Sequence, residues 1–326
     1  MSDRIVVRAP NWIGDAVLSL AAVRDVRRNF PHARVEVLAR PWVAELYQAV
    51  GEVDAVRETS RWRADVDNLR GGFDTAVLLT NSFGSALQVR LAGIPERWGY
   101  ATDLRGPLLT RRARVRDTLR GESEVYYYRA MLAGVGLRVS AQPDTSLACP
   151  PDWAGRAEAL LPGAERWIGL NPGAFFGPAK RWIPERYAAL ADRLVRKAGV
   201  RVAVLGAAAD RPVAEAIAGA MREPPTVLCG QTTLGELAAV VRRLALLVTN
   251  DSGPMHLASA LGVPVAALFG PTDWRETAPR GPHRLLREPV PCAPCKLRAC
   301  PVDHRCMRLL GVDRVERECL EMLEAA

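Results

Sequence analysis

Acidic, hydroxyl and glycine residues directly follow one predicted buried strand and could together bind a phosphate-bearing ligand. The strand covers residues 244–248, and Asn250-Asp251-Ser252-Gly253 comes just after it. Asp and Ser are favourable N-cap residues and Pro254 suits a first turn, so a helix is expected over residues 255–261. The amino end of a helix offers free N–H groups and a positive dipole end. The segment predicts either an anion site, with the Asp251 carboxylate facing the group attached to the phosphate, or an ordinary strand-to-helix turn with a good cap.

Two adjacent cations stand in a glycine-bearing loop between a predicted strand and a predicted helix. The loop reads Asn171-Pro-Gly-Ala-Phe-Phe-Gly-Pro-Ala-Lys180-Arg181-Trp182, and Lys180 is one of only three lysines in the chain. Two cations at a strand end could neutralise a diphosphate leaving group. The alternative is a loop with exposed charge.

Carboxylates also follow other predicted strands. Asp15, in Arg8-Ala-Pro-Asn-Trp-Ile-Gly-Asp15, would lie in the first turn of the next helix. There it could accept a proton from a substrate hydroxyl, or only compensate the helix dipole. Asp210, in Gly206-Ala-Ala-Ala-Asp210, could bind a ribose diol or cap the following helix. Asp65-Val66-Asp67 has the form of a D-x-D metal motif, but we expect a surface segment there, with no strand leading into it.

Arginines are concentrated in one stretch of the first half, and the chain has a formal net charge of +8. The stretch contains Arg105, Arg111, Arg112, Arg114, Arg116 and Arg120, opposed nearby only by Asp103 and Asp117. Arginine suits bidentate recognition of phosphate and carboxylate, and a solvated surface is the alternative. Because no known nucleic-acid-binding motif accompanies the charge, we do not expect a nucleic-acid partner.

Four cysteines lie close together near the end of the chain. Cys292, Cys295, Cys300 and Cys306 have the spacing C-x₂-C-x₄-C-x₅-C. In a cytosolic protein this favours zinc or an iron–sulfur cluster over disulfides, and reduced structural thiols are the further alternative. The spacing is not a standard pair of C-x₂-C motifs.

The predicted elements alternate along both halves of the chain. Strands are expected over residues 5–7, 35–39, 75–79, 167–170, 202–205, 226–228, 244–248 and 263–269. Helices are expected over residues 16–29, 42–50, 85–91, 184–197, 213–221, 234–243 and 255–261, with a final helix over 312–323. Such alternation predicts an α/β fold of two Rossmann-like domains, residues 1–160 and 161–326, the second carrying the cysteine-rich segment 292–306. Ligands would bind at the carboxyl ends of the strands, in a cleft between the domains.

The chain shows no sign of a membrane-spanning or secretory segment. No apolar stretch approaches the roughly 20 residues that cross a bilayer. The first residues run directly into a strand and do not resemble a signal peptide. We therefore expect a cytoplasmic protein.

Three motifs taken together resemble the ADP-heptose:lipopolysaccharide heptosyltransferases, glycosyltransferase family 9, which have the two-domain GT-B fold. They are Ala9-Pro-Asn-Trp-Ile-Gly-Asp15, Asn171-Pro-Gly-Ala with Gly177-Pro-Ala-Lys-Arg-Trp182, and Thr249-Asn-Asp-Ser-Gly-Pro-Met-His-Leu-Ala258 with Phe269-Gly-Pro-Thr-Asp273. Thr80-Asn-Ser-Phe83 and Ala92-Gly-Ile-Pro-Glu-Arg97 strengthen the likeness, which covers about residues 4–280. The forms Pro-Asn-Trp-Ile-Gly-Asp and Gly-Pro-Ala-Lys-Arg-Trp resemble the heptosyltransferase II branch.

The resemblance implies an inverting transferase that moves heptose from ADP-heptose to a sugar hydroxyl of the lipopolysaccharide inner core, on heptosyl-Kdo-lipid A. Asp15 matches the general base and Lys180, with Arg181 beside it, the cation on the donor diphosphate. Asp251 matches the carboxylate on the heptose hydroxyls, and the backbone of Ser252, Gly253, Pro254 and Met255 matches the diphosphate cradle. Asp210 takes the place of the ribose-binding acid, which is often Glu.

Acceptor binding is expected at Asn11, Arg111, Arg112 and Arg114. The arginines could face the acceptor's phosphates and carboxylates or an anionic leaflet, with peripheral contact at the inner face of the inner membrane. The resemblance implies no cofactor for catalysis.

Other functions remain open on the sequence alone. They are a GT-B transferase for another nucleotide sugar, heptosyltransferase I, and a nucleotide- or nucleic-acid-binding protein without catalysis. An NAD-dependent oxidoreductase is disfavoured because no G-x-G-x-x-G motif is present.

Overall fold

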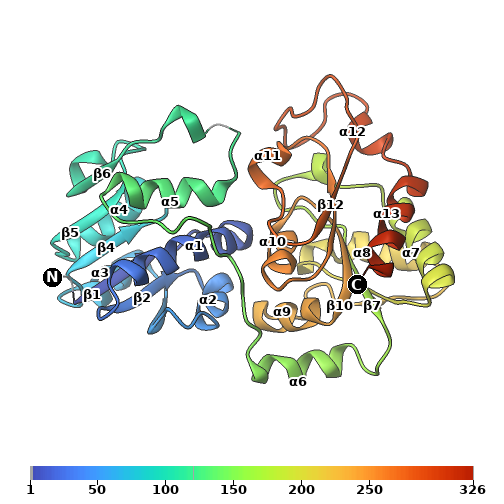
Figure 1. Ribbon diagram of the computed structural model, residues 1–326, viewed down its shortest axis with the longest axis horizontal. Helices are drawn as coiled ribbons and strands as arrows, with labels where there is room; N and C mark the ends of the chain where they lie inside the picture. Colours follow the sequence, from blue (N-terminus) through green and yellow to red (C-terminus); the bar gives the residue numbers. More distant parts are fainter. Residues whose placement is uncertain (1–2, 120, 326) are drawn as a thin grey trace. The chain divides into compact units, whose positions relative to one another are not determined.

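The computed structural model describes residues 3–119 and 121–325. The chain divides into two compact units, Met1–Thr145 and Ser146–Ala326, coloured blue to green and green to red in Figure 1. Each unit is built around a six-stranded sheet whose paired strands are all parallel. The predicted pair of Rossmann-like domains is therefore present.

The sheet of the first unit has the strand order β3-β2-β1-β4-β5-β6. Its strands are β1 (Arg4–Arg8), β2 (Arg34–Ala39), β3 (Ala55–Glu58), β4 (Thr75–Leu78), β5 (Glu96–Tyr100) and β6 (Arg111–Ala113). Its helices are α1 (Ile13–Asn29), α2 (Pro41–Gln48), α3 (Trp62–Leu69), α4 (Phe83–Leu91) and α5 (Glu124–Gly134), with 3-10 turns η1 (Gly106–Leu108) and η2 (Asp117–Leu119). Helix α1 packs against α5, and α3 packs against α4. Apolar side chains of α3 and α4 join those of β1, β2 and β4 in one core cluster.

The sheet of the second unit has the order β12-β11-β10-β7-β8-β9. Its strands are β7 (Trp167–Asn171), β8 (Arg201–Val204), β9 (Thr226–Val227), β10 (Leu244–Asn250), β11 (Val265–Phe269) and β12 (His283–Arg287). Its helices are α6 (Pro151–Leu160), α7 (Pro184–Ala198), α8 (Arg211–Ala220), α9 (Leu234–Arg242), α10 (Gly253–Ala260), α11 (Trp274–Thr277), α12 (Arg305–Arg308) and α13 (Val312–Glu324), with turns η3 (Pro178–Lys180) and η4 (Ala208–Asp210). The final helix α13 packs on α7 and contributes to the core of this unit.

Every strand and helix predicted from the sequence is found, and several others were missed. Strand β3 is half-exposed, β6 is only three residues long and starts with two arginines, and neither has the apolar pattern of a buried strand. The prediction for Asp65 was wrong, because β3 does lead into α3 and the Asp65 side chain is buried. Its Oδ1 accepts hydrogen bonds from the N–H and hydroxyl of Ser60 at 2.7 and 3.0 Å. Asp65 therefore fixes the start of α3.

The boundary between the units lies earlier than the predicted division between residues 160 and 161. Helix α6, which the prediction placed in the first domain, packs against α9 of the second unit (Figure 1). A Cβ atom at Gly235 would lie only 2.7 Å from the Trp153 ring, so the contact between the two helices is close. Just before α6, Leu147 N–H donates to the Ala260 carbonyl at 2.8 Å. Residues 146–160 thus belong structurally to the second unit.

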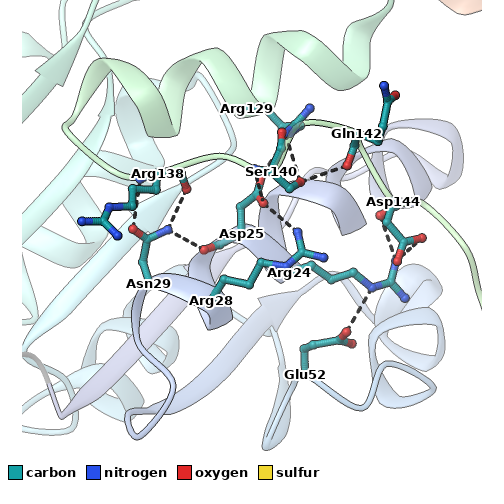
Figure 2. Close-up of polar contacts among 10 residues, drawn as sticks. All are labelled: Arg24, Asp25, Arg28, Asn29, Glu52, Arg129, Arg138, Ser140, Gln142 and Asp144. Atoms are coloured by element: carbon teal, nitrogen blue, oxygen red, sulfur yellow. Dashed lines mark hydrogen bonds and ion pairs between the residues drawn. The ribbon is translucent and has the colours of Figure 1, made fainter.

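A polar network fastens the last segment of the first unit to α1 (Figure 2). Asp25 is fully buried and accepts hydrogen bonds from Arg129 Nε at 2.9 Å and from Ser140 N–H at 3.0 Å. Burial alone raises the pKa of Asp25, but the bonds from Arg129 and Ser140 outweigh it and hold the pKa below its usual value. Further along the segment, Arg24 Nη1 donates to the Asp144 carbonyl at 2.9 Å. The chain is therefore held to the first unit up to the boundary.

In the described part of the chain, none of the helices combines the length and apolar character needed to cross a bilayer.

Candidate active site

Lys180 and Asp251 come together at the carboxyl edge of the second sheet. Lys180 ends the turn η3 that follows β7, and Asp251 directly follows β10, the strand beside β7. Lys180 Nζ lies 2.8 Å from Asp251 Oδ2 and 3.3 Å from its carbonyl oxygen. Their side chains are 13% and 4% exposed, so the pair is largely removed from water. A lysine here can reach a ligand at the strand ends as well as the carboxylate.

Arg181 and Asp210 form a second ion pair next to the first. Arg181 Nη2 lies 3.6 Å from Asp210 Oδ1, and the other carboxylate oxygen accepts from Ala207 N–H at 3.0 Å. Arg181 Nε is buried and lacks a hydrogen-bond partner within the described residues. Asp210 reaches this place because Gly173 has no side chain, since a Cβ atom there would lie 2.4 Å from Asp210 Oδ2. The predicted donor residues from three neighbouring strand ends thus form two adjacent pairs.

Two asparagines hold the loops that carry these pairs. Asn250 Oδ1 accepts from Trp182 N–H and from the Tyr187 hydroxyl, both at 3.0 Å, while its Nδ2 donates to the Pro172 carbonyl at 2.7 Å. Asn171 Nδ2 donates to the hydroxyls of Thr249 and Ser252 at 3.0 and 2.9 Å. The sequence analysis did not assign these supporting roles. An amide residue ending each of two adjacent buried strands was the available signal.

The start of α10 offers fewer N–H groups to an anion than the sequence predicted. Ser252 is the N-cap but makes no side-chain capping bond, because its hydroxyl faces Thr249 and Asn171. Pro254 has no N–H group, and Met255 N–H already donates to the Ser252 carbonyl at 3.1 Å. The predicted cradle of Ser252 to Met255 therefore reduces to the N–H groups of Ser252 and Gly253.

Asp15 and Asn11 lie at the carboxyl end of β1 in the first unit. Asp15 is in the first turn of α1, and its half-buried carboxylate makes no hydrogen bond or ion pair with the rest of residues 3–119 and 121–325. Asn11 is held by Arg8 Nη2, which donates to its Oδ1 at 3.0 Å, and by Trp42 Nε1, which donates to its carbonyl at 2.7 Å. Burial, followed by the nearby Arg40 charge, lowers the pKa of Arg8 to about 10. Asp15 is thus a carboxylate that is not committed to a structural partner.

The arginine cluster does not form one solvated surface. Arg111, Arg112 and Arg114 are exposed at and just after the edge strand β6, with Arg111 stacked 4.6 Å from the Trp98 ring centroid. Arg105 is instead fully buried, donates from Nε to the Tyr100 carbonyl at 2.7 Å, and has a pKa lowered to about 10 by burial. Arg120 lies outside the described residues. Among the described arginines of this cluster, Arg111, Arg112, Arg114 and Arg116 are exposed.

The cysteines are not arranged as a finished metal site. Cys292, Cys295 and Cys300 are exposed and Cys306 is buried. Within residues 3–119 and 121–325, no group of three or more His, Cys, Asp or Glu side chains is placed to hold a metal ion. No disulfide joins them in that part of the chain. Zinc or an iron–sulfur cluster here stays a prediction.

The chain is similar in sequence to heptosyltransferases. Lipopolysaccharide heptosyltransferase 2 of Escherichia coli (strain K12) is 33% identical over 298 residues, which cover 85% of each chain. Lipooligosaccharide heptosyltransferase 2 of Haemophilus influenzae (strain ATCC 51907 / DSM 11121 / KW20 / Rd) is 32% identical over 304 residues, covering 84% of this chain and 85% of the relative.

Solved structures agree with the fold. E. coli ADP-heptose LPS heptosyltransferase II matches with a TM-score of 0.87 at 29% identity, covering 99% of this chain and 100% of that one. A glycosyl transferase family 9 protein from Veillonella parvula DSM 2008 shares the fold with a TM-score of 0.86 at 23% identity, covering 99% and 98%. The predicted GT-B fold of two Rossmann-like domains is confirmed. Residues 62–305 match the model of glycosyltransferase family 9 (heptosyltransferase), and the chain belongs to this family.

Proposed function

We propose that this chain is an inverting heptosyltransferase that moves heptose from ADP-heptose to a sugar hydroxyl of the lipopolysaccharide inner core, on heptosyl-Kdo-lipid A. The observation that carries the proposal is the pair of adjacent ion pairs, Lys180–Asp251 and Arg181–Asp210, at the carboxyl edge of the second sheet. Cations beside carboxylates suit a ligand that joins a diphosphate to polyhydroxy groups. The relatives' names support ADP-heptose as the donor and lipopolysaccharide as the class of acceptor.

The second unit binds the donor in this proposal. Lys180, with Arg181 beside it, neutralises the charge that grows on the diphosphate as its bond to the sugar breaks. The N–H groups of Ser252 and Gly253, for which no partner is found within the described residues, contribute the positive end of α10. Asp251 accepts hydrogen bonds from the heptose hydroxyls and Asp210 from the ribose. The transfer itself uses no cofactor.

The first unit supplies the base and the acceptor site. Asp15 takes the proton from the acceptor hydroxyl as that oxygen forms a bond to the anomeric carbon. The bond from this carbon to the diphosphate breaks at the same time, ADP leaves with the electron pair, and the configuration inverts. A carboxylate without a structural partner is suited to this role. Asn11, held firmly beside Asp15, hydrogen-bonds the acceptor.

Arg111, Arg112 and Arg114 bind anionic groups of the lipid-borne acceptor, and the enzyme acts in the cytoplasm at the inner face of the inner membrane. The exposure of these side chains supports the assignment. Replacing Arg112 and Arg114 with Gln should raise KM for the lipid acceptor several-fold and leave ADP affinity unchanged. An Arg196→Gln/Arg222→Gln variant removes two exposed charges from the second unit and serves as the matched control. An unchanged acceptor KM would contradict the assignment.

A structural zinc ion or iron–sulfur cluster at Cys292, Cys295, Cys300 and Cys306 is a separate proposal. Burial raises the pKa of the Cys306 thiol, and the nearness of the other three thiols raises it further, so each of the three lies within electrostatic reach of Cys306. The exposed cysteines would have to turn inward to complete a site. Metal and acid-labile sulfide analysis of the purified full chain should give about one site per chain. If wild type contains no more metal and no more acid-labile sulfide than a Cys295→Ser/Cys300→Ser variant, the proposal is refuted.

The transfer reaction is tested by ADP release with ADP-heptose and heptosyl-Kdo-lipid A. Turnover should require both substrates and should fall at least tenfold with another ADP-sugar in place of ADP-heptose. ADP binding without turnover on any lipid-A-core acceptor would refute the proposed substrates. It would leave the fold and the donor site, and would favour a transferase for another nucleotide sugar.

A further inference from the structure

The cysteine segment, residues 292–306, lies against the turn that carries Lys180. Ala179 N–H donates to the Arg298 carbonyl at 3.1 Å. Arg298 Nε in turn donates to the Phe176 carbonyl at 2.9 Å. These bonds join two segments more than a hundred residues apart in the sequence. The segment therefore packs against the turn that carries Lys180 and supports it.

His304 completes the hold on Ala179. Its Nε2 lies 2.7 Å from the Ala179 carbonyl and must be the donor, because a carbonyl oxygen can only accept. The N–H and the carbonyl of Ala179 are thus both bonded to the cysteine segment. That carbonyl belongs to the peptide bond that leads into Lys180. Since peptide bonds are planar, fixing the carbonyl also fixes the backbone nitrogen of Lys180.

Packing around the same turn is close. A Cβ atom at Gly177 would lie 2.2 Å from the Arg298 carbonyl oxygen, so only glycine allows the two backbones to approach this way. The Phe176 ring lies 5.1 Å from Lys180 Nζ and 5.4 Å from the Arg298 guanidinium carbon. Both cations thus contact one ring, which limits where the Lys180 side chain can go.

The segment itself is fastened to the sheet. Lys296 N–H donates to the Pro271 carbonyl, just after β11, at 2.8 Å. The buried Cys306 lies against Gly270, where an added Cβ atom would be 3.1 Å from its sulfur. His304 has a φ of 55°, a left-handed conformation that costs a non-glycine residue free energy and persists only where surrounding contacts hold it. Arg298 and His304 are therefore presented to the Lys180 turn from a fixed base.

We propose that Arg298 and His304 are positioning residues that hold Lys180 in place for the donor diphosphate. The proposal rests on the proposed function in one respect, namely that the ligand of Lys180 is a nucleoside diphosphate. Neither residue needs to touch the substrate. They act through the Ala179 peptide and the Phe176 ring, and the cysteine segment thereby gains a role in the reaction.

The test uses the full chain with His304→Ala, His304→Gln and, as matched control, Val302→Ala, an exposed residue of the same segment. Small displacements of a charged group cost about ten- to a hundredfold in rate. His304→Ala should therefore lower kcat about tenfold and weaken ADP binding measured by calorimetry, with KM for the acceptor unchanged. His304→Gln keeps an N–H donor at similar reach and should recover most of both losses, while Val302→Ala should match wild type.

A double-mutant cycle separates positioning from general damage. Lys180→Gln removes the charge that Arg298 and His304, here called the clamp, are proposed to hold in place. In that background His304→Ala should change ADP affinity by less than about twofold. Equal losses from His304→Ala with and without Lys180→Gln would overturn the proposal. Full ADP affinity and kcat in His304→Ala would do so as well.

The ADP measurement also keeps this proposal apart from the proposed function. If wild type binds ADP but transfers no heptose, the substrate assignment fails. The double-mutant cycle of ADP affinities then still tests whether His304 positions Lys180. If heptose is transferred normally by wild type and by His304→Ala alike, the clamp fails and the proposed function stands.

Discussion

Lys180 and Asp251, to which we assign the donor ligand, form a buried ion pair. The two side chains are largely buried and 2.8 Å apart, so each is the main compensation for the charge of the other. Removing one partner of a buried pair leaves an uncompensated charge, whereas replacing both with apolar residues is often neutral. The pair is therefore expected to add little net stability over apolar residues, which agrees with the ligand-binding role that we propose for it.

This gives a prediction about stability. Lys180→Met should lower the free energy of unfolding by about 3–5 kcal/mol, and Lys180→Met/Asp251→Leu should recover most of that loss. Urea unfolding of the full chain measures both. A double variant less stable than the single one would show that Asp251 has other buried roles, and this account of the pair would then be wrong.

Elements in this protein were predictable where the apolar pattern was strong. Strands such as β7 and β10 are buried runs, and the residues expected after their ends, Lys180 and Asp251, form an ion pair. Strands β3 and β6 were missed because their arginines and glutamates face solvent or ion-pair partners. They are strands because they pair with β2 and β5, and this pairing leaves no pattern in their own residues. Asn171 and Asn250 could be noticed as amide residues at the ends of buried strands, but their partners could not, because these contacts and that of His304 join residues far apart in the chain.

The link between α1, α5 and the segment after α5 makes one element-scale prediction, a dependence of stability on pH. Hydrogen bonds from Arg129 and Ser140 hold the pKa of Asp25 below its ordinary value of 3.8, so the folded state favours the ionised form. That stabilisation is complete at pH well above 3.8 and is lost as the pH falls through the lowered folded pKa. Asp25→Asn should cost about 3–5 kcal/mol at pH 7 and much less once the pH is below the lowered folded pKa, because the carboxyl is then neutral in both states.

Unfolding of the full chain followed at pH 7 and at low pH would check this. Asp67→Asn, an exposed aspartate on α3, is the matched control and should change little. A loss for Asp25→Asn that is equal at both pH values would contradict the ionic account of the network.

At the scale of the whole molecule, the division after Thr145 predicts which fragments fold. Residues 146–326 contain a complete sheet with α6 on α9 and should fold alone and bind ADP. Residues 161–326 lack α6, which uncovers the α9 surface around Gly235, and should be less stable or aggregate. Circular dichroism and ADP calorimetry on both fragments measure this, and equal stability of the two would argue for a boundary at residue 160.

In the proposed mechanism the base lies in the first unit and the donor-binding groups lie in the second, and Asp15→Ala separates the two. ADP affinity and ADP release should be measured on the same preparation with ADP-heptose and heptosyl-Kdo-lipid A, with Asp67→Ala as a surface control. Asp15→Ala should bind ADP as wild type does, because the proposed donor groups lie in the second unit, while kcat should fall by about 10²–10⁴. Turnover within a few-fold of wild type would contradict the role of Asp15 and with it the proposed mechanism.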